Sequence, residues 1–113
     1  MRILSYTTLN PETAQPPSAT EFEKMGAFIE ELRERGILVE TGGAMDDMVE
    51  MHFVRKDGKT TITDGPFTES KEVVGGYAVM DVADKAQAIE LTKRFLEIVG
   101  GDATCHFHEV SIA

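Results

Sequence analysis

The sequence predicts a single α+β domain in which two helices cover one face of a mainly antiparallel sheet. Strand-like and helix-like patterns follow one another in the order β-α-β-(ββ)-α-β, which is typical of a ferredoxin-like arrangement. Both helix-like stretches carry apolar residues on one side, so each has one face to bury. The 113 residues, 42% of them hydrophobic, provide one core of modest size, and we expect one domain over residues 1–113.

The first strand and the first helix are expected in the first third of the chain. Residues 2–8 combine apolar content with the β-branched bias of a strand. Ser18 with Glu21 forms a capping-box pattern, and Gly36 suits the position after a helix end, so a helix is expected over about residues 19–35. The residues expected on its buried side recur at helical spacing: Phe22, Met25, Ile29 and Leu32.

The middle of the chain is predicted to form strands joined by turns. Strands are expected at residues 37–41, 48–55, 60–63 and 75–82. Asp57-Gly58 is the strongest short-range signal for a hairpin between the second and third of these. Gly75 and Gly76 favour a β-bulge or a close backbone approach over a phosphate site, because a strand start is the wrong context for a phosphate loop.

A second helix and a last strand complete the predicted fold. Asp84 is a typical helix N-cap, and Gly100 with Gly101 ends the helix. The residues expected on its buried side are Ala88, Ile89, Leu91, Phe95, Leu96 and Val99. The last strand is expected from Thr104 to Ile112.

One face of the sheet is left without cover, because both helices are expected on the other face. Apolar strand residues nevertheless fall on both sides of the alternation: Met51, Phe53, Tyr77, Val79 and Phe107. A second sheet is therefore expected to pack there, and its most economical source is a second copy of the chain. The sequence predicts a homodimer.

Composition argues against several classes of partner. A net charge of −9 without a basic stripe would repel nucleic acid, so no direct nucleic-acid partner is expected. The opening "MRILSYTTL" is too short and too polar for a signal peptide or a membrane span, so no membrane partner is expected. Cys105 is the only cysteine, which excludes an internal disulfide and favours a reducing, cytoplasmic location.

The segment "TDGPFTESKE", residues 63–72, carries more ionisable and aromatic side chains than a turn needs. Asp64 can accept hydrogen bonds from the amides that follow it, and Gly65-Pro66 makes a stiff corner. Capping alone explains Asp64, so a structural role is favoured over an acid, base or pocket anchor. We expect this loop to wall a ligand pocket, with the ligand-binding residues Asp64, Phe67, Glu69, Lys71 and Glu72. The alternative for its charged side chains is a solvated surface run.

The same segment carries a family resemblance. "TDGPFTESKEVVGGY" resembles the signature of the YCII-related, DGPF-domain family, and "MGAFIEELRERGILVETGGAM" and "KDGKTTI" are similar to its first helix, second strand and hairpin. The resemblance implies a dimeric ferredoxin-like α/β barrel, with a pocket near each sheet and close to the dimer seam. Some relatives of a shorter branch use a His–Asp pair near the first strand for elimination chemistry. Residues 2–20 contain no histidine, so that pair cannot be transferred to this chain.

Other candidate sites receive modest support from the sequence. His106 and His108 share one strand face and could join His52 in a metal site, but exposed strand histidines are the simpler interpretation, and no metal or cofactor is predicted. They stand where relatives usually carry a Glu-x-Arg strand. Cys105 is interpreted as a small hydrophobic residue rather than a nucleophile.

Two functions remain open at this point. The first is a protein that binds a small polar or aromatic molecule, with catalysis undecided, since spacing alone assembles no catalytic set. The second is a non-enzymatic dimeric module with a regulatory role. The resemblance suggests a sigma-factor or stress context for such a module.

Overall fold

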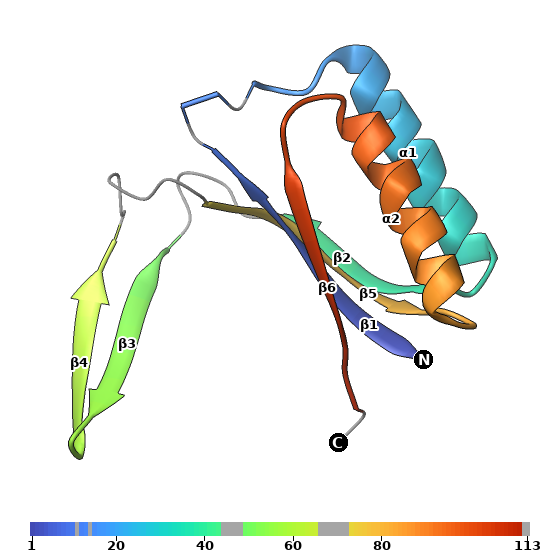
Figure 1. Cartoon of the computed structure of the whole chain (residues 1–113). Helices are drawn as coiled ribbons and strands as arrows, with labels where there is room; N and C mark the ends of the chain where they lie inside the picture. The colour runs from blue at the N-terminus through green and yellow to red at the C-terminus, as the bar shows by residue number, and fades with distance from the viewer. Residues whose placement is uncertain (11, 14, 44–48, 66–72, 112–113) are drawn as a thin grey trace.

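The computed structural model describes residues 1–10, 12–13, 15–43, 49–65 and 73–111. A four-stranded sheet contains β1 (Arg2–Leu9), β2 (Leu38–Gly43), β5 (Val73–Asp81) and β6 (Thr104–Glu109). Its order is β2-β5-β1-β6, with every neighbouring pair antiparallel. The helices α1 (Ala19–Glu34) and α2 (Lys85–Val99) lie together on one face of this sheet (Figure 1). The predicted ferredoxin-like α+β fold is confirmed, and the sheet formed by the described residues is open rather than closed into a barrel.

The helix ends follow the predicted signals. The Ser18 side chain accepts a hydrogen bond from the Glu21 backbone N–H at 3.2 Å, and Asp84 accepts one from Gln87 at 2.8 Å. Gly36 and Gly100 adopt the left-handed conformation, with φ of 71° and 72°, that favours glycine after a helix. These local signals fix where each helix starts and stops.

The core lies between the sheet and the two helices. Its buried hydrophobic residues are Ile3, Phe28, Leu32, Ile37, Met80, Val82, Ala88 and Leu91. Phe22 was expected on the buried side of α1 but is 66% exposed, so that prediction was wrong. Ile89 was expected on the buried side of α2 but is also exposed, so that prediction was wrong as well. It stands one position after the buried Ala88 and so turns away from the sheet.

The strands β3 (Met51–Lys56) and β4 (Lys59–Asp64) form a separate hairpin that projects away from the four-stranded sheet (Figure 1). Asp57 and Gly58 both have positive φ, 52° and 77°, as the predicted tight hairpin turn requires. Every residue of the two strands is exposed, including Phe53 and Ile62, which pair across the hairpin. Met51, one of the apolar strand residues for which a second covering sheet is expected, is exposed in the single chain. No helix in the described part of the chain is long and apolar enough to cross a membrane.

Candidate functional site

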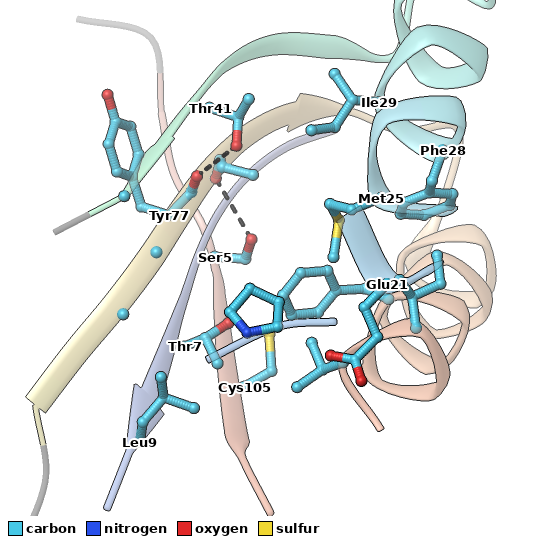
Figure 2. Close-up of a pocket in the computed structure, with 18 of the residues that line it drawn as sticks. Ser5, Thr7, Leu9, Glu21, Met25, Phe28, Ile29, Thr41, Tyr77 and Cys105 are labelled. Atoms are coloured by element: carbon cyan, nitrogen blue, oxygen red, sulfur yellow. Dashed lines mark hydrogen bonds between the residues drawn. The ribbon is translucent and has the colours of Figure 1, made fainter. Parts of the chain in front are cut away.

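A cavity of about 790 Å³ opens between the helix side of the sheet and the two helices (Figure 2). Its floor is the inward face of β1 and β5, and its walls are the apolar sides of α1 and α2. The described side chains that form the apolar wall include Met25, Phe28, Ile29, Leu91, Phe95 and Ile98. A volume of this size suits a small organic molecule, since ligand pockets commonly measure roughly 300–1,000 Å³.

The cavity exists because inward-facing residues become smaller along two paired strands. Near the closed end, Ile3 lies opposite Met80, and both are buried in the core. The next inward pairs are Ser5 with Ala78 and Thr7 with Gly76. Short side chains cannot fill the space beneath the helices, so the sheet is packed at one end and hollow at the other.

A β-bulge at Gly75 shapes the open end of this floor. Thr7 pairs with Gly76 and Thr8 pairs with Val74, which leaves Gly75 as the extra residue. A Cβ at Gly75 would lie 2.8 Å from Leu9 Cδ1, so a larger residue here would require the Leu9 side chain to shift. The predicted bulge at the glycine pair is thereby confirmed.

Two hydroxyls on the floor are at least nine-tenths buried, Ser5 at 8% exposed and Thr7 at 7%. The Ser5 Oγ donates to the Ala78 carbonyl at 3.5 Å, well beyond the usual ~2.7–2.8 Å for such a bond. That weak bond leaves most of the hydroxyl's capacity available to a ligand. By contrast, Thr41 Oγ1 donates to the Tyr77 carbonyl at 2.9 Å and is already satisfied (Figure 2).

Cys105 lines the same floor from β6, opposite Thr7. Burial raises the pKa of the Cys105 thiol above its ordinary value, and a hydrogen bond with Thr7 opposes that effect only in part. The thiol therefore stays protonated at neutral pH, where it is a weak nucleophile. Its place in the cavity agrees with the interpretation of Cys105 as a small hydrophobic residue.

A model of the YCII-related domain matches residues 1–96, from β1 through most of α2. The chain belongs to the YCII-related domain family. A comparison with curated proteins found no match. The matched part of this YCII-related domain includes the cavity floor on β1 and β5, whereas β6 with Cys105 lies beyond it.

Of the ligand-binding residues predicted for this YCII-related domain, the structure describes only Asp64. Asp64 is exposed at the end of β4, opposite Met51 in the hairpin, and does not line the cavity. The Gly65 backbone N–H donates to the Glu50 carbonyl at 2.7 Å, which closes the base of the hairpin. Phe67, Glu69, Lys71 and Glu72 lie outside the described residues. The ligand-binding role of all five residues therefore stays a prediction.

Sequence reasoning missed the residues of the cavity floor. Ser5 and Thr7 occupy the inward positions of β1, where a strand next to two helices normally carries large apolar side chains. The signal was present in "RILSYTTL", because inward Ile3 is followed at alternate positions by two hydroxyl residues. Glu21 was noted only as part of a helix cap, yet it also lines the cavity.

The opposite face of the sheet carries a stack of aromatic and imidazole rings. The Tyr6 ring lies 4.8 Å from the His106 ring and 6.2 Å from the His108 ring, both nearly parallel to it. The two histidines share one face, as predicted. His52 lies on β3, in the other sheet, and the described residues contain no group of three or more side chains suited to a metal.

Proposed function

We propose that this YCII-related domain binds a small, mainly apolar molecule with an aromatic body in the cavity between its sheet and helices. The observation that carries the proposal is the cavity itself, which combines apolar walls with the two buried floor hydroxyls Ser5 and Thr7. Apolar walls favour an apolar body, and a few convergent polar groups orient it. The described lining contains no histidine, and the Cys105 thiol is protonated, so binding is supported better than catalysis.

A tryptophan reporter tests this proposal, because the chain contains no tryptophan. Phe22, 66% exposed, lines the cavity, whereas Phe53, 63% exposed, lies on the hairpin and does not. Titration of Phe22→Trp with the neutral probe N-phenyl-1-naphthylamine should quench tryptophan emission saturably. The matched variant Phe53→Trp should respond only weakly and without saturation. Equal responses, or no saturable response in Phe22→Trp, would contradict binding in the cavity.

We also propose that the protein is a homodimer that covers the open sheet face. The chain exposes 8389 Å² at a mass of 12.4 kDa, whereas a compact monomer of that mass exposes about 6,100 Å². A stable interface removes roughly 800 Å² from each partner, which this excess readily supplies. Leu4 and Tyr77 on the open face, with Phe53 and Ile62 on the hairpin, provide apolar surface for it. Under twofold symmetry, the open sheet face and the hairpin of each chain would both pack against the other chain.

In this arrangement the cavity and the seam lie on opposite sides of the sheet. Ser5 and Thr7 face the cavity, whereas Leu4 and Tyr6 alternate with them and face the proposed partner. Residues that face the cavity and residues that face the proposed partner therefore alternate along β1. Ligand binding and assembly are therefore separable by mutation.

Light scattering checks the assembly. We expect a mass twice the chain's 12.4 kDa at micromolar concentration. Leu4→Glu should yield monomers, because it places a charge inside an apolar sheet contact. Ile89→Glu is the matched control, since Ile89 and Leu4 are both 37% exposed but Ile89 lies on the helix layer. A monomeric wild-type protein, or dissociation in both variants, would count against an interface on the open face.

A further inference from the structure

On the basis of the proposed function, we infer that the ligand carries a cationic nitrogen at the cavity mouth, beside Glu21 and Asp102. The apolar body would lie over the floor between the helices, and the cation would remain at the partly solvated rim. An amine on an aromatic or aliphatic body has this form. A carboxylate, phosphate or sulfonate does not.

The charged side chains of the described lining are all acidic. They are Glu21, in the first turn of α1, and Asp102, just after α2. Figure 2 shows Glu21 extending from α1 toward the end of the cavity where Thr7 and Cys105 lie. Glu21 as a whole residue is half-buried, whereas Asp102 is exposed.

The end of α2 adds negative potential at the same place. The Glu21 Oε1 lies 4.0 Å from the point where a Cβ on Gly100 would stand, so the carboxylate faces the C-cap of α2. Carbonyl groups at a helix C-terminus carry a partial negative charge, which basic residues in the last turn often balance. The last turn of α2 has no basic residue.

The arginines of the helix layer and the four-stranded sheet are paired elsewhere, and the lysines of α1 and α2 do not line the cavity. Glu31 binds Arg94 and Arg35, and Asp81 binds Arg2, all at distances between 2.7 and 3.0 Å. Within the described chain, neither Glu21 nor Asp102 forms an ion pair. The mouth thus holds two carboxylates and a helix C-terminus, opposed among the described groups only by the partial positive charge of the α1 N-terminus beside Glu21, and a cationic ligand group would supply a full counter-charge.

Aromatic rings that line the cavity favour the same group. Phe22 and Phe95 line the cavity on α1 and α2, and a cationic nitrogen near an aromatic face gains further attraction from the ring. An anionic group at the same place would be repelled. It would lie beside like charges and the faces of electron-rich rings.

Competition between two naphthalene compounds tests the charge preference. N-phenyl-1-naphthylamine is first bound to the Phe22→Trp reporter and then displaced by 1-naphthylmethylamine or by 1-naphthylacetate, which share a body and differ in charge. At low salt the amine should displace the probe at a concentration about tenfold lower than the acid. Equal or stronger displacement by 1-naphthylacetate would overturn the inference while leaving cavity binding intact. Failure of the neutral probe to bind would instead overturn the proposed function.

Variants of the mouth carboxylates give the second readout. Glu21→Gln and Asp102→Asn should each reduce the preference for the amine about threefold or more, without weakening binding of the neutral probe. Glu23→Gln is the matched control, because Glu23 is an exposed residue of the same helix that does not line the cavity. If Glu23→Gln reduced the preference as much as Glu21→Gln, the preference would arise from the net charge of the protein, and the inference would be wrong.

Discussion

Replacing Leu91 by alanine should lower the free energy of unfolding by about 2–5 kcal/mol, the usual cost of removing a large aliphatic side chain from a packed core. Leu91 is among the largest fully buried side chains of the chain and lies on the side of α2 that faces the sheet. Its removal would extend the neighbouring cavity into the core, and α1 and α2 could close the new space only by moving. Small domains are stable by only about 5–15 kcal/mol, so the loss would be a large share of the total.

Chemical denaturation followed by circular dichroism, at one fixed protein concentration, measures this loss. Ile89→Ala is the control, because it removes a comparable side chain from the exposed side of the same helix. We expect it to cost less than about 1 kcal/mol. Similar losses in both variants would mean that α2 does not pack on the sheet through the side that contains Leu91.

Acid should weaken the attachment between the two helices through Glu31. The Glu31 carboxylate accepts two hydrogen bonds of 2.7 Å from the Arg94 guanidinium and one of 3.0 Å from Arg35. The hydrogen bonds from Arg94, with a smaller contribution from Arg35, lower the pKa of Glu31 from 4.5 to about 2. The Arg94 guanidinium also lies 4.8 Å from the centre of the Phe28 ring. Arg94 of α2 therefore contacts both Glu31 and Phe28 of α1.

The sign of the pH effect follows from the direction of this pKa shift. A carboxyl whose pKa is lower in the folded chain stabilises the fold fully above its unfolded pKa, here 4.5, and loses that contribution as the pH falls toward about 2. Unfolding measured from pH 6 to pH 2 should therefore show a steeper loss of stability for the wild type than for Glu31→Gln. Glu30→Gln should behave as the wild type, since Glu30 forms only an exposed contact of 3.4 Å with Arg33. Parallel profiles for wild type and Glu31→Gln would show that this contact contributes nothing to acid stability.

Much of the fold could be predicted because its signals are local. Ser18, Asp84 and the Asp57-Gly58 pair each interact with residues no more than a few positions away, so their conformations follow from short stretches of chain. The side of α2 occupied by Ile89 was predicted wrongly for a related reason. The apolar residues of that helix span a wide arc, and periodicity alone does not tell which edge of the arc faces the sheet.

The cavity could not be predicted because it depends on register between distant strands. It arises where Ser5 lies opposite Ala78 and Thr7 opposite Gly76, and these partners are about seventy positions apart in the chain. Each of these small residues is unremarkable alone. Only the pairing of β1 with β5, together with the bulge at Gly75, gathers them beneath the helices.

The projecting hairpin also bears on how this chain can change over evolutionary time. Without β3 and β4, the remaining order β1-α1-β2-β5-α2-β6 is already a complete ferredoxin-like unit with its four strands adjacent. The hairpin is therefore additional to that unit, and it contributes none of the buried core residues in the described chain. Mutations on its surface would therefore act on what the hairpin contacts rather than on the core of the single chain. The contacts of the hairpin can thus change while the scaffold and the cavity stay the same.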